Sequence, residues 1–142
     1  IKRLVVAVSR SYLQKEGAPR LVLATLSDER HELGILMCAW LAATRRLRTH
    51  YLGADCPARE IGRFASNVQA TAVLISVVRP ESGAATLREL TDLARELPER
   101  CEIWLGGAGV DQLATDQLPA RCTVLPTAFD FEQRLDLMPH AN

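Results

Sequence analysis

The chain has no excess of charge of either sign and no long hydrophobic run. Its 142 residues carry 17 Lys plus Arg and 17 Asp plus Glu, so no overall positive field would attract it to phosphate backbones. We expect no direct contact with nucleic acid. The longest uncharged apolar stretch, Leu33 to Thr44, is too short to cross a bilayer, and no signal peptide is visible. We therefore expect a cytoplasmic protein without membrane contact.

The marks of several common sites are also missing. The four cysteines, at positions 38, 56, 101 and 122, form no CxxC pair, and three lie in or beside apolar runs, where cysteine packs as a small hydrophobe. We expect them to be reduced; only Cys56, before a predicted helix start, has a thiolate that a helix terminus could favour. No Gly-x-Gly-x-x-Gly motif is present, which argues against a nicotinamide cofactor. No nucleophile and base pair appears, so we expect no enzymatic activity of the domain itself.

The length and the composition are those of one globular domain. A chain of 142 residues, 48% apolar and 24% charged, can bury a single core. Residues 1–17 keep helical apolar spacing up to a Gly17-Ala18-Pro19 break, and we interpret them as a helix left from an upstream element. Residues 18–142 then form the domain. Because the chain begins at Ile1 without Met, we expect it to be a fragment of a longer protein.

Short apolar runs alternate with longer stretches of helical period, which indicates βαβ units and a parallel sheet. Right-handed crossovers then place helices on both faces. We predict an α/β fold with a five-stranded, parallel, doubly wound sheet of the flavodoxin-like or Rossmann-like type. The predicted strands are 21–25, 49–52, 72–77, 102–105 and 123–125.

Five helices are expected between and after these strands. The first follows His31 and ends near Arg45 or Arg46, with a predicted stripe of apolar residues facing the sheet: Leu33, Leu36, Met37, Trp40 and Leu41. The second opens at 55–57 with Pro57 near its first position. The third covers 82–97, and two shorter helices lie near 110–117 and 131–137.

Three sparse marks recur along this pattern. Glu29-Arg30-His31-Glu32-Leu33-Gly34 is followed after 41 residues by Ser76-Val77-Val78, and after 27 more by Gly106-Gly107. The triple resembles the signature of cobalamin-binding domains, Asp-x-His-x-x-Gly, Ser-x-Leu and Gly-Gly, as in methionine synthase, the coenzyme-B12 mutases and the MerR-type regulators. Glu29 stands in place of Asp and Val78 in place of Leu. The Glu variant looks most like the light- and B12-responsive MerR-type regulators, and the resemblance covers roughly residues 18 to 138.

His31 is the candidate metal ligand. Ligands of doubly wound sheets bind at the carboxyl ends of the strands where the strand order reverses, and a neutral imidazole nitrogen is a good ligand for cobalt. Metal-bound histidine usually donates its second ring N–H to a carboxylate. Glu29 is the natural partner, with Asp28 and Glu32 as competitors. Ser82 could extend this relay as a hydroxyl partner, or it could serve as a helix N-cap.

The other marked residues suit a cofactor with a long tail. A glycine in the first helical turn costs roughly 1 kcal/mol relative to alanine, so Gly34 suggests a close approach to the backbone. By resemblance, the nucleotide tail of cobalamin would enter a slot between this helix and the sheet. Ser76 would hydrogen-bond the buried base, and Gly106 and Gly107 would leave room for the tail. Thr127 is a further candidate for the slot lining.

Three hypotheses for function follow from the resemblance. The first is a cobalamin-binding sensor domain of a bacterial transcriptional regulator, in which His31 replaces the cofactor's own base as lower axial ligand of adenosylcobalamin or methylcobalamin. Upstream helical-bundle and DNA-binding segments, photoreception and a homo-oligomer would accompany that function. The second is the corrinoid-carrying subunit of a mutase or methyltransferase. The third is a diverged domain that binds haem, whose iron also accepts imidazole, or an empty interaction module.

Overall fold

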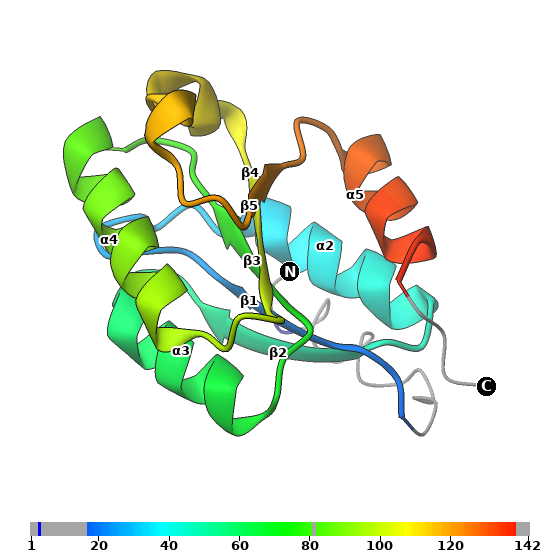
Figure 1. The fold of residues 1–142 in the computed structure, drawn as a ribbon. Coiled ribbons are helices and arrows are strands. Elements are labelled where there is room, and N and C mark those ends of the chain that lie inside the picture. The colour runs from blue at the N-terminus through cyan, green and yellow to red at the C-terminus, as the bar shows by residue number, and fades with distance from the viewer. Residues whose placement is uncertain (1–2, 4–16, 81, 139–142) are drawn as a thin grey trace.

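A parallel sheet of five strands forms the centre of the molecule (Figure 1). The structure is a computed structural model, and it describes residues 3, 17–80 and 82–138. The strand order is β2-β1-β3-β4-β5, and every pair is parallel. This is the flavodoxin-like order, so the predicted fold class is confirmed. The strands are β1 Arg20–Ala24, β2 Arg48–Gly53, β3 Ala72–Ser76, β4 Glu102–Gly106 and β5 Cys122–Val124.

Helices connect the strands and cover both faces of the sheet. The α-helices are α2 Leu33–Thr44, α3 Ala58–Asn67, α4 Gly83–Glu96 and α5 Ala128–Asp136. Between β4 and β5, the predicted short helix consists of two 3-10 turns, Ala108–Gln112 and Thr115–Gln117. Local caps explain two of the starts. The Ser82 hydroxyl accepts from the Ala85 N–H at the start of α4, and Thr127 forms a capping box with Asp130 at the start of α5.

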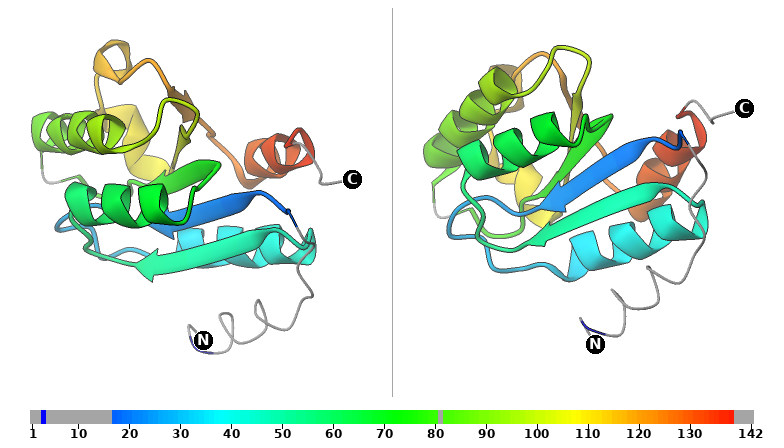
Figure 2. Two further views of the ribbon diagram at one scale, coloured as in Figure 1. Left: turned by 60° about the horizontal axis from the view of Figure 1, so that its bottom comes forward. Right: turned by 90° about the horizontal axis from the view of Figure 1, so that it is seen from below.

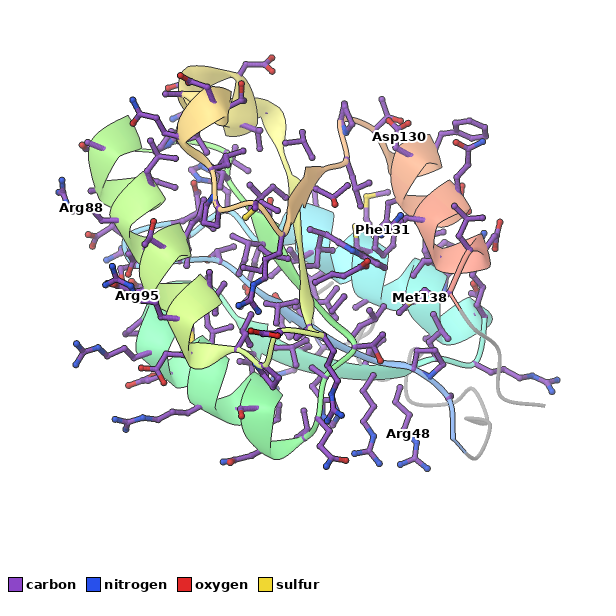
Figure 3. All side chains as sticks on the ribbon, viewed as in Figure 1. Arg48, Arg88, Arg95, Asp130, Phe131 and Met138 are labelled. Atoms are coloured by element: carbon purple, nitrogen blue, oxygen red, sulfur yellow. The ribbon has the colours of Figure 1, made fainter. Side chains whose placement is uncertain are left out.

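The sheet separates two hydrophobic cores. Alternate residues of β1 point to opposite faces, so Leu21 and Leu23 pack with α2 and α5, whereas Val22 and Ala24 pack with α3 and α4. Figure 2 shows α3 and α4 side by side over one face, with α2 and α5 over the other. In Figure 3 Phe131 points from α5 toward the sheet, where its ring meets that of the fully buried Trp104.

The predicted apolar stripe of α2 was right for Leu36, which is buried, and for Leu41, which packs against the core. It was wrong for Leu33, Met37 and Trp40, which are exposed. The helix packs against the sheet through a different set of residues. Those buried residues are Ile35, Leu36, Ala39, Ala42 and Ala43. Because α2 is apolar all round, its hydrophobic period did not distinguish one face from another.

Other expectations lie outside the structure or are modified by it. The helix predicted for residues 1–17 falls almost entirely on residues that are not described. No helix among the described residues has the length and apolar character that a membrane crossing requires.

All four cysteines are free. Burial, followed by the charges of Glu60, Asp55 and Glu89, raises the pKa of Cys56, so the helix start does not favour its thiolate.

Candidate functional site

The marked residues gather where the strand order reverses, at the carboxyl ends of β1 and β3. His31 lies in the loop between β1 and α2, two residues before the helix begins. Its side chain is 51% exposed, so the imidazole is accessible to a ligand that lies above this edge of the sheet. The adjacent loop is held by main-chain bonds, including the N–H of Asp55 to the carbonyl oxygen of Glu29 at 3.0 Å.

The carboxylate of Glu29 is hydrogen-bonded to Nδ1 of the His31 ring. The distance from Nδ1 of His31 to Oε1 of Glu29 is 2.7 Å, and the same carboxylate oxygen accepts the main-chain N–H of His31 at 3.3 Å. Of the two predicted competitors, Glu32 accepts the hydroxyl of Tyr51 with its carboxylate, and Asp28 donates its main-chain N–H to the carboxylate of Asp55. A proton on Nδ1, directed to Glu29, leaves the lone pair of Nε2 available to a metal.

Glu29 is itself fixed by the loop that follows β3. Its second oxygen, Oε2, accepts the main-chain N–H groups of Val78 at 2.9 Å and Arg79 at 2.8 Å. The residue is 6% exposed. Burial raises the pKa of Glu29, but the hydrogen bonds from Arg79, Val78 and His31 outweigh it, so the pKa lies below its ordinary value of 4.5. Glu29 is therefore an ionised carboxylate that links His31 to β3.

We expect Glu29→Gln to lower the free energy of unfolding at pH 7 by about 1 kcal/mol, because hydrogen bonds to a charged acceptor are stronger than those to a neutral one. A carboxylate whose pKa is depressed by folding stabilises the protein above its unfolded-state pKa, and this contribution is lost as pH falls through the folded-state value. The difference between variant and parent should therefore shrink below pH 4.5.

Urea denaturation at pH 7 and pH 4 measures this effect. Glu99→Gln is the matched control, since Glu99 is exposed and its substitution should change stability little at either pH. An equal loss of stability at both pH values for Glu29→Gln would contradict the assignment of Glu29 as a buried carboxylate with a depressed pKa.

A narrow slot lies between α2, α5 and the ends of β3 and β4, with a volume of about 210 Å³. Its walls are mostly apolar, with Cys38 and Leu41 from α2 and Phe131 from α5. Glu29 and His31 do not line it, but six of the nine residues predicted from the sequence do. They are Gly34, Ser76, Val78, Gly106, Gly107 and Thr127.

Gly34 and Gly106 leave open space in this slot. A Cβ at Gly34 would point at the Ser76 hydroxyl oxygen, 3.8 Å away, and one at Gly106 would lie 3.6 Å from the carbonyl oxygen of Leu125. Both distances are ordinary van der Waals contacts. The fold therefore tolerates a side chain at either position, and such a side chain would occupy slot volume.

Gly107 differs, because the backbone itself requires glycine there. Its φ of 101° and ψ of 155° lie in a region that is essentially restricted to glycine, and a Cβ would lie 2.3 Å from the carbonyl oxygen of Val77. That carbonyl also accepts the Gly109 N–H at 2.8 Å, so it cannot move freely. A substitution of Gly107 thus changes the fold as well as the slot.

We predict that Gly107→Ala lowers the free energy of unfolding by about 3 kcal/mol or more, since the strained conformation alone costs roughly 1–3 kcal/mol and the clash adds to it. Gly106→Ala, one residue earlier, should change stability by less than about 1 kcal/mol. Thermal and urea denaturation of the pair without any ligand provide the measurement. Equal stabilities of the two variants would contradict this account of Gly107.

Ser82 lies apart from the slot and from His31. Its hydroxyl caps α4, at 3.3 Å from the Ala85 nitrogen, and no hydrogen bond among the described residues joins it to Glu29. It borders a second hollow of about 140 Å³, which Glu29 and Ser76 also line. The main-chain N–H groups of Val78 and Arg79 form the hydrogen bonds to Glu29 that had been predicted for the Ser82 hydroxyl. Sequence reasoning missed them, because an N–H group carries no sequence mark.

Comparisons with known proteins find one relative in sequence and several in fold. No family model matches the chain. Over 87 residues it is 33% identical to the HTH-type transcriptional repressor CarH of Myxococcus xanthus, in an alignment that covers 61% of this chain and 29% of the repressor. The chain thus spans less than a third of that relative, and the alignment says nothing of the repressor's remaining length.

Solved structures share the fold at lower identity. A cobalamin-binding protein from Desulfitobacterium hafniense DCB-2 has a TM-score of 0.67 at 20% identity, covering 84% of this chain and 58% of its own. The methanol:cobalamin methyltransferase complex MtaBC of Methanosarcina barkeri gives 0.71 at 20%, with 82% and 45% covered. The monomethylamine corrinoid protein of M. barkeri gives 0.68 at 16%, with 95% and 64% covered. The chain thus shares its fold with these three solved structures and, over 87 residues, is similar in sequence to the repressor CarH.

Proposed function

We propose that the domain binds cobalamin with His31 as the lower axial ligand of cobalt and the cofactor's own base displaced into the slot. The observation that carries this proposal is the pairing of an exposed imidazole with a buried carboxylate, 2.7 Å from Nδ1, beside an apolar slot. Residues 29 and 31 would hold the metal side of the cofactor. Gly34, Ser76 and Gly106 would accommodate its tail.

The donor set fits a metal that brings most of its own ligands. Among residues 17–80 and 82–138, no three His, Cys, Asp or Glu side chains gather as a metal site. His31 would therefore contribute one axial nitrogen, and a macrocycle would supply the equatorial ones. Corrinoid cobalt and haem iron both fit this description. The slot favours the corrinoid, because a haem has no nucleotide tail to place between Gly34 and Ser76.

The main-chain N–H groups of Val78 and Arg79 hold Glu29 in place, and Glu29 would in turn control how strongly His31 binds the metal. A carboxylate that accepts the Nδ1–H of a ligating histidine fixes its tautomer and raises the basicity of the other nitrogen. Loss of such a partner typically costs about 10- to 100-fold in metal affinity. The proposed chemistry is binding and ligand control, and we propose no catalytic step for this domain on its own.

We further propose that the domain serves as the sensor of a transcriptional regulator. The support is its similarity to the repressor CarH and the Glu29 variant of the first mark. In that role, exchange of the upper ligand, including by light, would change the assembly of upstream segments that bind DNA. The chain itself has no net charge and would not contact DNA.

A corrinoid-carrying subunit is the second candidate, favoured by the fold shared with the methyltransferase complex and the corrinoid protein of M. barkeri. The two functions differ in the fate of the upper ligand. A carrier bound to methylcobalamin would give up its methyl group to a nucleophilic acceptor when a partner methyltransferase is present. A sensor would keep the group in the dark and lose it only with its signal.

Titration of the 142-residue chain with hydroxocobalamin, adenosylcobalamin and haemin, followed by visible absorption, tests the proposal. We expect saturable binding of the two cobalamins with a spectral change, and weaker or no binding of haemin. Haemin binding alone would favour the haem alternative. No binding of any of the three would favour an empty interaction module.

A further inference from the structure

The outward side of α2 is apolar and exposed. The helix has 12 residues and none is charged. Leu33, Met37 and Trp40, spaced by four and three residues, lie along one side of it, and their exposed fractions are 63%, 53% and 42%. We call these three residues the α2 outer face. The opposite side of the helix packs on the sheet through Ile35 and Ala39.

Two of the other helices, α3 and α4, have the polar outer surfaces expected of surface helices. On α3, Arg59, Glu60 and Arg63 are exposed. On α4, Arg88 and Arg95 point away from the sheet in Figure 3. A helix that is apolar on all sides is normally covered on all sides, and contiguous exposed apolar residues mark an interaction surface. The α2 outer face is therefore expected to be an interaction surface.

The slot does not extend over the whole of this face. Met37 borders the slot, but Leu33 and Trp40 do not contribute to its lining. The slot lies on the side of α2 that faces α5, where Cys38 and Leu41 are found. A tail bound in the slot would leave Leu33 and Trp40 exposed, so the tail is not the occupant of this face.

Residues 17–19, which precede β1, lie beside the end of this helix. The carbonyl oxygen of Pro19 accepts the N–H of Arg48 at 3.1 Å, and Leu47 just before it is bonded to the last turn of α2 through the carbonyl oxygen of Ala42. Gly17, with a φ of 71°, gives the backbone a turn before β1. Residues 1–16 therefore join the molecule within a few residues of the end of α2.

These 16 residues have the composition to match the face. Ile1, Leu4, Val5, Val8 and Tyr12 recur at helical spacing. Twelve helical residues extend about 18 Å, the same length as the 12-residue α2. We propose that residues 1–16 pack as an amphipathic helix along the α2 outer face, with their apolar side against Leu33, Met37 and Trp40. This inference does not depend on cofactor binding.

Tryptophan quenching in the 142-residue chain without cofactor tests the proposal. Trp104 is fully buried, so acrylamide quenching reports on Trp40, the other of the two tryptophans. We expect Trp40 to be protected in the parent chain. Leu4→Gln with Val8→Gln should raise its quenching severalfold and shift its emission to the red. Arg3→Gln with Arg10→Gln, on the other side of the same helical wheel, is the matched control and should change neither.

Hydrogen exchange of the unmodified chain provides a measurement that needs no variant. Amides of residues 4–13 should be protected, independently of protein concentration. Three results would overturn the proposal: free quenching of Trp40 in the parent chain, exchange of residues 4–13 at the rate of an unstructured peptide, or protection that appears only with dimerisation. The last result would make a second copy the occupant.

Discussion

His31→Ala is expected to bind cobalamin at least about 100-fold more weakly, because removing the ligand should cost more than the roughly 10- to 100-fold loss seen when only its carboxylate partner is removed. The cobalamin that still binds should have the absorption spectrum of a form without imidazole below the cobalt. The imidazole is exposed and outside the core, so the unfolding free energy should change by less than about 0.5 kcal/mol beyond the loss of its contact with Glu29.

Visible titration and urea denaturation of the same protein measure both quantities. His50→Gln is the matched control: His50 lies on β2, beside Phe64, and does not border the slot. It should retain the parent's bound spectrum. Unchanged affinity and spectrum for His31→Ala would show that another group ligates the cobalt, or that the bound cofactor keeps its own base.

Gly34→Leu should abolish cobalamin binding while leaving the folded protein more stable. A side chain at Gly34 points across the slot toward Ser76, so leucine would fill the space proposed for the tail. In a helix leucine is favoured over glycine by up to about 1 kcal/mol, and the atom nearest the new Cβ, the Ser76 hydroxyl oxygen at 3.8 Å, lies at an ordinary van der Waals distance. Binding and stability are thus expected to change in opposite directions.

The experiment pairs thermal denaturation with titration by hydroxocobalamin and haemin. Arg63→Leu, at an exposed position on α3, controls for the addition of a leucine to a helix surface and should bind cobalamin normally. Normal cobalamin binding by Gly34→Leu would contradict the slot assignment. Loss of binding together with loss of stability would mean that Gly34 has a role in the fold.

The sheet was predictable because its strands carry unambiguous local signals. The run from Ala72 to Ser76 is apolar and uninterrupted, and it proved to be buried throughout in the centre of the sheet. Turn residues and helical periods between the strands then fixed a parallel order. The predicted strand ends differ from the observed ones by one residue or not at all, because β-branched runs end where polar or turn residues begin.

The orientation of α2 was not predictable in the same way. A helix without charged residues gives no polar side from which to infer its buried one. The large residues Leu33, Met37 and Trp40 suggested a stripe, but the sheet accepts the small Ala39 and Ala42, which allow the helix to approach closely. Which side of α2 is buried depends on the shape of the facing sheet, and the spacing of apolar residues along the helix gives no information about that shape.

The candidate site was predictable in its residues but not in all its contacts. The spacing of His31, Ser76 and Gly106 along the chain placed them at one edge of the sheet, since all three follow or end parallel strands. The bond between His31 and Glu29 follows from their separation of two residues. The clamp on Glu29 from main-chain N–H groups could not be foreseen, because any residue at 78 and 79 supplies the same donors.

The identity of the cobalt ligand is the central claim, and electron paramagnetic resonance of bound cob(II)alamin tests it most directly. The parent chain is prepared with natural nitrogen and again fully labelled with nitrogen-15, and each is loaded with unlabelled cofactor. If His31 ligates the cobalt, the superhyperfine triplets of the unlabelled protein become doublets in the labelled one, and the change is absent in His31→Ala. Triplets that persist in the labelled protein would show that the cofactor's own base remains bound, and would contradict the account.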